Sequence, residues 1–226
     1  MNLWDRQYKE FGFSAQRLYP NDELLRFLGS NFFSTDKSKR KRIKILEVGC
    51  GSGANLWMVA KEGFAAYGID TSNEGLKLCR QMLKKWNVRA DIRKGNMLAL
   101  PFRDNYFDSI FDVASMQHLS FSQHKGAYAE IKRALKPSGK FFSYHIGNKS
   151  FSYRYGEGRV IDKFTLDNIK EPKALSDCGI TCFISGKAAE RMLEGLNFNN
   201  INIEDITKSY NNRKIRMHYL AIRAQK

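Results

Sequence analysis

"KILEVGCGSGANLWMVAKEGFAAYGID", residues 44–70, decides the fold class of this chain. An apolar run precedes glycines at positions 49, 51 and 53, and Asp70 closes the stretch. The glycines let the backbone turn sharply after a strand and approach a ligand with no Cβ in the way. The loop opens onto a helix N-terminus, where unpaired N–H groups favour polar or anionic ligand groups. A carboxylate at Asp70 can accept hydrogen bonds from both ribose hydroxyls, so the stretch predicts a site for an adenosine-containing cofactor.

Strand and helix patterns alternate along most of the chain. This alternation predicts βαβ units with right-handed crossovers. The short "NN" at positions 211 and 212 predicts a C-terminal antiparallel hairpin. The expected fold is therefore α/β: a Rossmann-like, seven-stranded, mostly parallel sheet with helices on both faces. The strands are expected at residues 43–48, 65–69, 88–95, 106–113, 140–146, 200–207 and 216–222, and the helices of this region at 54–62, 72–86, 123–135 and 186–196, with a turn at "KPSGK", residues 136–140.

Two segments lie outside this alternation. Residues 1–42 are expected to form an N-terminal helical cap, with Asn21 capping its second helix, and a basic linker, "KSKRKRIK" at 37–44, whose bland interpretation is a solvated surface. Residues 43–226 would then be the main domain. Within it, residues 147–185 show no clean period, and a loop of that length predicts a substrate-side insertion or lid.

Composition limits the partners and the compartment. The formal net charge of +15 attracts polyanions, anionic membranes or phosphorylated substrates. No apolar run is long enough to span a bilayer, and the N-terminus lacks the apolar core of a signal peptide, so the chain is expected to be a cytoplasmic protein without a membrane partner. The four cysteines match no zinc or redox spacing and the four histidines are scattered, which predicts free thiols and no metal site.

The glycine loop alone leaves the cofactor open. "GCGSGA" also fits the dinucleotide fingerprint G-x-G-x-x-A, with Asp70 near the place of its acid. A nicotinamide enzyme and a methyltransferase are both compatible with it, and a tight turn between strand and helix can also be purely structural.

Four motifs in order separate these alternatives. "EVGCGSG", "GNMLALPF" (95–102), "NYFDSIFDVASMQHL" (105–119) and "IKRALKPSGKFFSY" (131–144) together resemble the class I S-adenosylmethionine-dependent methyltransferases of small-molecule type. The resemblance covers about residues 43–146, with weaker support from "AAERMLEGLNFNNINIE" (188–204). It implies S-adenosyl-L-methionine as cofactor and S-adenosyl-L-homocysteine as product, and it disfavours a nicotinamide enzyme.

The resemblance assigns roles around the cofactor. Glu47 and the loop backbone would hold its amino-acid end. The loop positions concerned are Gly49, Cys50, Gly51 and Gly53.

Further positions would surround the nucleoside. Asp70 would bind the ribose, with Thr71 against its edge. Asn96 stands where the family often has an acid facing the adenine amino group, and an amide oxygen can accept the same hydrogen bond. Met97 would pack on the adenine face.

The candidate catalytic residues are Asp112, His118 and His145. Asp112 and Val113 end the fourth strand beneath the methionine portion, and Asp112 departs from the small or neutral residue often found there. Its carboxylate would orient an acceptor or pair with a lysine. His145 near the end of the fifth strand and His118 after the fourth are candidate bases; for His118 a structural or cofactor-facing role is the alternative.

The acceptor pocket is expected between the N-terminal helices and the insertion. Trp4, Tyr8 and Tyr19 would cover the cofactor with Arg17 nearby, although helix packing explains these aromatics equally well. "SFSYRYGEGR" (150–159) suits a planar or anionic substrate, such as a phosphorylated metabolite or nucleotide-linked sugar, or a lid with solvated charges. Its relevant residues are Phe151, Tyr153, Arg154, Tyr155 and Arg159.

The leading functional hypothesis is transfer of a methyl group to an oxygen or nitrogen of a small, anionic or sugar-linked metabolite, by a monomer or homodimer. RNA methylation is the second hypothesis. It is supported by the charge but not by the motifs. "DVASM" stands where many base-amine methyltransferases carry Asn/Asp-Pro-Pro-aromatic, and no catalytic cysteine is placed just after strand four, as methylation of a pyrimidine ring carbon would require. A cofactor-binding protein without enzymatic activity is the third.

Overall fold

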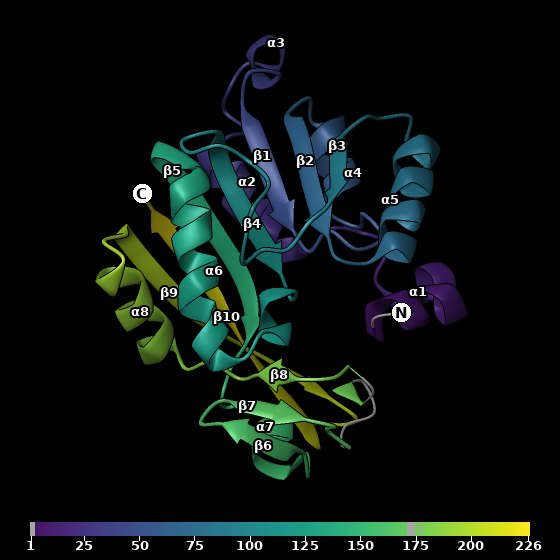
Figure 1. Cartoon of the computed structure of the whole chain (residues 1–226), viewed down its shortest axis with the longest axis vertical. Coiled ribbons are helices and arrows are strands. Elements are labelled where there is room, and N and C mark those ends of the chain that lie inside the picture. Colours follow the sequence, from purple (N-terminus) through teal and green to yellow (C-terminus); the bar gives the residue numbers. More distant parts are fainter. Residues whose placement is uncertain (1–2, 171–174, 177) are drawn as a thin grey trace.

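Seven strands form one sheet in the order β3-β2-β1-β4-β5-β10-β9 (Figure 1). The computed structural model describes residues 3–170, 175–176 and 178–226. Strands β1 to β5 pair in parallel, β10 runs antiparallel to β5, and β9 runs antiparallel to β10. The predicted mostly parallel sheet and its antiparallel hairpin are confirmed. The strands are β1 (Lys44–Val48), β2 (Ala65–Asp70), β3 (Asp91–Lys94), β4 (Phe107–Val113), β5 (Leu135–Ile146), β9 (Asn199–Tyr210) and β10 (Ile215–Gln225).

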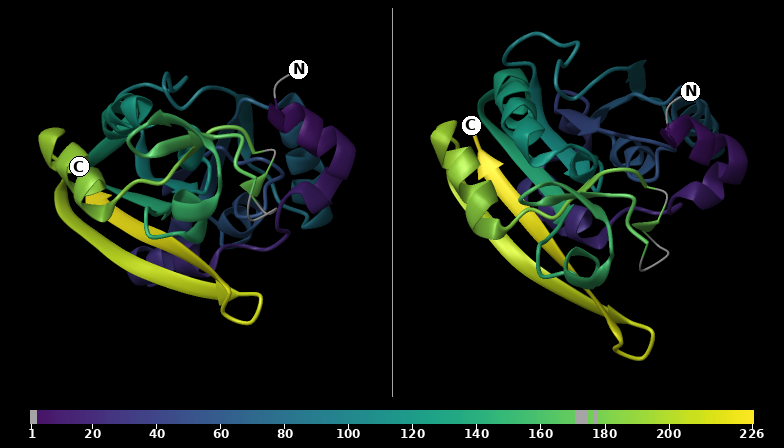
Figure 2. Two further views of the ribbon diagram at one scale, coloured as in Figure 1. Left: turned by 90° about the horizontal axis from the view of Figure 1, so that it is seen from below. Right: turned by 60° about the horizontal axis from the view of Figure 1, so that its bottom comes forward.

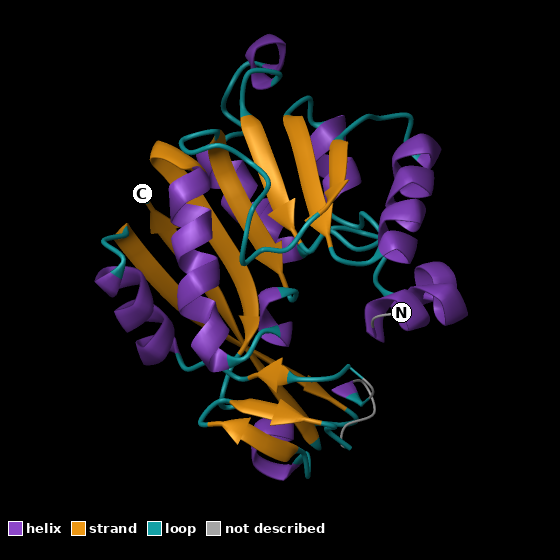
Figure 3. Ribbon diagram, in the orientation of Figure 1, coloured by secondary structure: helices purple, strands orange, loops and turns teal. Residues whose placement is uncertain are grey.

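Helices cover both faces of this sheet, as predicted (Figure 3). On one face, Leu28 of α2, Trp57 of α4 and Leu76 of α5 pack in one apolar cluster. On the other, Ile131 of α6 and Leu193 of α8 pack in a second cluster. The bounds are α2 (Asp22–Asn31), α4 (Leu56–Lys61), α5 (Asn73–Lys85), α6 (Phe121–Ala134) and α8 (Gly186–Gly195).

The two N-terminal helices have different surroundings. Asn21 caps α2 as predicted, since its side chain accepts from the N–H groups of Glu23 and Leu24. Helix α2 packs on one face of the sheet, where Phe27 stacks on Phe142 of β5 with ring centroids 5.0 Å apart. Helix α1 (Leu3–Phe11) packs against α5 instead, and a 3₁₀ turn (Gly12–Ala15) follows it. Residue 2, the expected start of the first helix, lies outside the described residues. The division of the chain at residue 42 stays a prediction.

The basic segment contains one structural arginine among exposed neighbours. The segment begins with the short helix α3 (Lys37–Arg40), which precedes β1. Arg40 is only 5% exposed. Its guanidinium donates to the carbonyls of Phe33, Thr35 and Glu62 and pairs with the Glu62 carboxylate at 2.5 Å. The expectation of a solvated linker is therefore wrong for Arg40, which ties the segment to the end of α4.

The insertion contains a small second sheet, which the sequence did not predict. Helix α7 (Phe151–Tyr155) precedes an antiparallel sheet of β6 (Arg159–Asp162), β7 (Thr165–Asp167) and β8 (Thr181–Cys182). Figure 1 shows this sheet beyond the carboxyl ends of the main strands. Residues 171–174 and 177 of the expected insertion lie outside the described residues. Strands of two to four residues are too short to show a period, so the segment reads as irregular.

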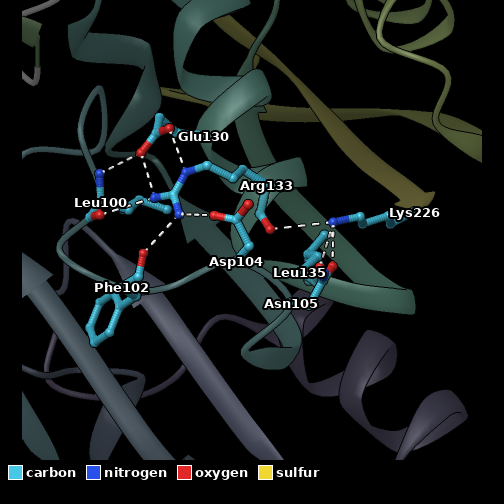
Figure 4. Close-up of polar contacts among 8 residues, drawn as sticks. All are labelled: Leu100, Phe102, Asp104, Asn105, Glu130, Arg133, Leu135 and Lys226. Atoms are coloured by element: carbon cyan, nitrogen blue, oxygen red, sulfur yellow. Dashed lines mark hydrogen bonds and ion pairs between the residues drawn. The ribbon is translucent and has the colours of Figure 1, made fainter.

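Arg133 of α6 anchors the loop between β3 and β4 (Figure 4). The guanidinium donates to the carbonyls of Leu100 and Phe102 and pairs with Asp104 and Glu130 at 2.7 and 2.8 Å. Since this loop begins with residues 95–97, its anchoring also positions them at the sheet edge.

The "KPSGK" turn is an interruption within β5. The pairing with β4 passes from Phe107 opposite Leu135 to Ser109 opposite Lys140, so residues 136–139 leave the ladder. Ser138 adopts a φ of +63° there. The predicted turn is present, and the strand begins before it.

Replacing Arg40 with methionine tests its structural role. Because three carbonyls and a carboxylate lose their donor, we expect Arg40→Met to lower the free energy of unfolding by about 3 kcal/mol. Urea unfolding at neutral pH measures this. The matched control Lys39→Met, at an exposed position, should change it by less than about 0.5 kcal/mol. Equal effects of the two variants would contradict the assignment.

Candidate functional site

A pocket of about 730 Å³ lies at the carboxyl ends of β1, β2, β3 and β4. Ligand sites of open α/β sheets lie at this edge. Helix α1 and the 3₁₀ turn close one side, and residues 175, 176, 178 and 180 of the insertion contribute to another. The predicted site residues among its lining are Gly49, Asp70, Thr71, Asn96, Met97, Val113 and His118.

The glycine loop is shaped by close contacts within the protein. Gly49, Gly51 and Gly53 have φ values of +72°, +49° and +83°, which residues other than glycine rarely adopt. A Cβ at Gly49 would lie 2.3 Å from Ser115 Cβ, and one at Gly51 would lie 2.2 Å from Tyr8 Oη. Of the predicted loop positions, Gly49 alone is among the pocket-lining residues. Gly51 instead makes room for the N-terminal segment, and Gly53 makes room for Cys79.

Cys50 is turned into the protein. Its side chain is 1% exposed and lies in the apolar cluster beneath α4 and α5. Its N–H donates to the Ile69 carbonyl at 2.9 Å, beside the Gly49 N–H at 2.8 Å. These bonds join the loop to the end of β2.

Asp70 links the loop, β2 and α5. Its two carboxylate oxygens accept from the N–H groups of Gly51 and Ser72, each at 2.8 Å. Burial raises the pKa of this carboxyl. Each oxygen keeps a further lone pair, and the residue lines the pocket, so the carboxylate can still accept a hydrogen bond from a ligand.

Asn96 and Met97 line the pocket from the next loop. The Asn96 side-chain oxygen accepts from the Leu98 N–H at 2.9 Å, which fixes the direction of the amide. The oxygen has a second lone pair and the amide nitrogen two hydrogens, so both remain usable by a ligand.

Glu47 is buried and is not among the lining residues, whereas Arg17 is half-buried; both have buried polar atoms without a described partner. Glu47 Oε1 accepts from Asn55 Nδ2 at 2.5 Å, while its Oε2 has no partner within the described part of the chain. Burial raises the pKa of Glu47 to about 8. Arg17 lines the pocket, and its Nε and Nη2 likewise lack partners among the described residues. Burial lowers the Arg17 pKa, and attraction to Glu47 opposes that shift.

Asp112 does not line the pocket, contrary to the expected role. Its carboxylate is fully buried and accepts from the N–H groups of Ser115 and Met116 at 2.8 and 2.9 Å. It also accepts from the Ser115 and Ser143 hydroxyls. Asp112 therefore neither orients an acceptor nor pairs with a lysine. It holds the 3₁₀ turn Met116–His118 at the end of β4.

His118 faces the pocket from that turn. Its ring packs edge-on against Trp4 with centroids 4.8 Å apart. Nδ1 lies 3.1 Å from the Ile180 carbonyl oxygen, which can only accept, so the proton of a neutral ring belongs on Nδ1. Nε2 keeps a lone pair, which accepts from the Gln117 amide nitrogen at 3.4 Å. Burial lowers the pKa of His118, which keeps the ring neutral at physiological pH.

His145 points away from the pocket, so the expected orientation is wrong. Its ring is fully buried on the α6 face of the sheet, with Nε2 2.9 Å from His124 Nε2 and Nδ1 2.7 Å from the Ile146 oxygen. Both ring nitrogens are occupied within the protein. Burial lowers the pKa of each of these histidines to about 4.

The sequence did not predict the residue that closes the pocket over the loop. Gln16 Oε1 accepts from the Ser52 N–H at 3.1 Å, the Ser52 hydroxyl at 2.9 Å and the Tyr8 hydroxyl at 3.2 Å. It sits after a 3₁₀ turn with no periodic signal. Of the predicted covering residues, Trp4, Tyr8 and Arg17 line the pocket, whereas Tyr19 is 64% exposed and packs against Trp57.

The aromatic and basic segment 150–159 is also absent from this lining, as far as the structure describes it. Nor do any three His, Cys, Asp or Glu side chains of the described residues gather as metal ligands. Among the same residues, no helix combines the length and apolarity needed to cross a membrane.

Comparison with known proteins agrees with this geometry. Residues 46–143 match the family model for a methyltransferase domain. Sterol 24-C-methyltransferase of Saccharomyces cerevisiae is 27% identical over 161 residues, 65% of this chain and 41% of the relative. Demethylmenaquinone methyltransferase of Tropheryma whipplei is 36% identical over 98 residues, 43% of this chain and 39% of the relative. The chain thus spans less than half the length of these relatives.

Solved structures share the fold. A SAM-dependent methyltransferase of Methanosarcina mazei superposes with a TM-score of 0.68 at 21% identity, over 81% of this chain and 92% of its own. Phosphoethanolamine N-methyltransferase 2 of Haemonchus contortus, solved with S-adenosylhomocysteine, gives 0.69 at 18% identity, over 98% of this chain and 56% of its own.

Fold and pocket together define a Rossmann-like α/β protein with its site at the carboxyl edge of the sheet. With the ordered motifs and the matching family model, residues 46–143 form a methyltransferase domain of the class I S-adenosylmethionine-dependent type.

Proposed function

We propose that this chain transfers a methyl group from S-adenosyl-L-methionine to an oxygen or nitrogen of an uncharged small molecule. One observation carries the proposal: Glu47 and Arg17 lie close enough to shift each other's pKa, and each has buried polar atoms without a described partner, with no ion pair between them. Buried polar atoms without partners are costly, so they mark places that a ligand completes. An amino-acid zwitterion supplies one group for each.

These residues fit the cofactor's amino-acid end. Its ammonium would donate to Glu47 Oε2, and its carboxylate would accept from the Arg17 guanidinium. Charge-assisted hydrogen bonds of this kind are the strong ones. The nucleoside would follow the lining, with its ribose on Asp70 and its adenine beside Asn96 and Met97. The bound cofactor supplies a methyl group on a sulfonium, which is a good electrophile.

The protein's own contribution is to position the acceptor and take its proton. His118 lines the pocket, and its Nε2 carries a lone pair because the Ile180 carbonyl holds the proton on Nδ1. The Gln117 amide nitrogen lies 3.4 Å from this Nε2 and would give way to the acceptor. A neutral imidazole in this state can accept a proton from a hydroxyl or a protonated amine. Trp4 and Ile180 fix the ring from two sides and reduce the space for water.

The lining favours an uncharged acceptor. Arg17 is the one arginine or lysine among the described lining residues, and the cofactor's carboxylate would occupy it. A phosphorylated or nucleotide-linked acceptor would find no second cation there. The apolar residues near His118 suit a neutral molecule with a reactive hydroxyl or amine; they are Trp4, Leu98, Leu119, Leu175 and Ile180. The relative named for sterol methylation is consistent with an uncharged acceptor, although its name places the methyl group on carbon.

Cofactor binding should release a proton. Glu47, with its pKa near 8 in the free protein, is mostly protonated at pH 7, and a bound ammonium favours the carboxylate. Binding therefore strengthens as pH rises towards 8, by up to about tenfold per pH unit. Isothermal titration with S-adenosylhomocysteine at pH 7, in buffers of different ionisation enthalpy, measures the number of protons released on binding.

Two variants make this test specific. Glu47→Gln should weaken S-adenosylhomocysteine binding and make the binding enthalpy independent of the buffer. Glu23→Gln changes a buried carboxyl of α2 outside the described pocket lining and should leave both unchanged. A buffer-independent enthalpy in the unmodified protein would overturn the role of Glu47, and no binding at all would overturn the proposed function.

Replacing His118 tests the base. With a panel of uncharged phenols and amines, His118→Gln should lower turnover about 10²–10⁴-fold at pH 7. S-adenosylhomocysteine affinity should change less than about threefold, since the residue acts on the acceptor. Because burial lowers the His118 pKa, turnover by the unmodified enzyme should not fall with decreasing pH until the pH is below the range in which histidine ordinarily titrates. Unchanged turnover in the variant would exclude the role, and turnover on RNA but on no panel member would favour the second hypothesis.

A further inference from the structure

A second groove, of about 590 Å³, lies between α7 and the tip of the β9–β10 hairpin. It shares no described lining residue with the first pocket. Figure 2 shows the hairpin tip projecting beyond the rest of the molecule. The groove is lined by Asn148, Lys149, Ser150, Phe151, Tyr153, Arg154, Tyr155, Arg213, Lys214 and Arg216.

Positive charge dominates this groove. Five of its lining residues are lysine or arginine, and none is acidic among the residues described. Lys149 pairs with Asp205 at 2.9 Å, but both side chains are more than half exposed, so the pair neutralises little. The other four cations make no ion pair within the described part of the chain. Like charges gathered on a concave surface raise the local concentration of anions.

An exposed aromatic surface borders these charges. Phe151 and Tyr155 form a ring pair with centroids 5.0 Å apart, and Tyr155 is 56% exposed. The Arg154 guanidinium lies 5.9 Å from the Tyr155 ring centroid. Aromatic rings and arginine planes beside a basic groove are the features on which unpaired nucleobases stack.

Both walls of the groove are held in place. The Ser150 hydroxyl donates to the His218 carbonyl, and the His218 N–H donates to the Ser150 oxygen, each at 2.9 Å. These bonds fix the start of α7 on β10. On the opposite wall, Asn211, Asn212 and Arg213 all adopt left-handed φ values, which close the turn that presents the hairpin's cations.

We propose that this groove binds single-stranded nucleic acid, with phosphates on the hairpin and α7 cations and a base on Tyr155. The concave shape suits a chain-like polyanion better than the flat surface of an anionic membrane. The net charge of +15 adds long-range attraction. The segment 150–159, expected at the acceptor site, thus serves a separate binding surface. The inference does not depend on methyl transfer.

Two double variants of equal charge test the groove. Arg213→Glu with Arg216→Glu reverses two groove cations, whereas Lys39→Glu with Lys41→Glu makes the same charge change on exposed residues at α3. The probe is a fluorescent oligouridylate of about twelve nucleotides. By fluorescence anisotropy at about 0.15 M salt, we expect the groove variant to lose affinity at least about tenfold and the α3 variant less than about threefold. S-adenosylhomocysteine affinity, unchanged in both, would show that they are folded.

The salt dependence and the aromatic residue give independent readouts. Loss of two phosphate contacts should reduce the slope of log K against log salt by about 1.4 for a single strand. Tyr155→Ala should weaken oligouridylate binding about fivefold or more, while its affinity for inorganic phosphate stays unchanged.

Several results would overturn the proposal. Equal losses in both double variants would assign binding to net charge, and no measurable binding by the unmodified protein would remove the site. Variant-sensitive binding to phosphatidylglycerol vesicles with no sensitivity towards oligouridylate would make the groove a lipid surface. None of these outcomes bears on cofactor binding in the first pocket.

Discussion

The carboxylate of Glu47 and the guanidinium of Arg17 are buried close enough to shift each other's pKa, yet they form no ion pair. A buried charge without a partner is among the costliest features a protein can contain. The surrounding structure keeps the two apart. Asn55 holds one oxygen of Glu47 on β1, and the N-terminal segment that carries Arg17 is clamped to the glycine loop through Gln16. The pocket is thus arranged around a carboxyl group and a guanidinium whose unpartnered polar atoms a zwitterion would complete.

Other parts of the site depend on this arrangement. Because glycine lacks a Cβ, the loop adopts left-handed backbone angles, and Tyr8 and Ser115 occupy the places where Cβ atoms would be. Asp70 joins the loop to α5, and Asp112 holds the turn that carries His118. Asp70 therefore both shapes the site and lines it, whereas Asp112 contributes only by holding this turn. Such positioning of an acceptor can contribute about 7–11 kcal/mol to a methyl transfer in favourable cases.

Much of the fold and half of the site could be predicted because they rest on local signals. The apolar strand, the glycines and Asp70 lie within one short segment, and their spacing fixes their places at the sheet edge. His145 shows the limit of this reasoning. Sequence places it near a strand end, but adjacent strand residues point to opposite faces of the sheet. The pairing of β5 with β4 and β10 decides to which face His145 points.

Long-range contacts explain the remaining differences. Arg40 looks like its basic neighbours, and only the fold brings Glu62 to it. Gln16 and Arg17 follow an irregular turn, so no period marks them, and Ser52, which Gln16 contacts, lies more than thirty residues away on the glycine loop. The strands of the insertion are too short for a pattern. The groove beside α7 combines segments about sixty residues apart, which no local motif could show.

A crystal structure of the complex with S-adenosylhomocysteine tests the central claim most directly. The account predicts that the ligand's amino group lies within hydrogen-bond distance of Glu47 Oε2 and that its carboxylate lies on the Arg17 guanidinium. A complex in which Glu47 and Arg17 pair with each other, or in which the amino-acid end of the ligand lies elsewhere, would contradict it.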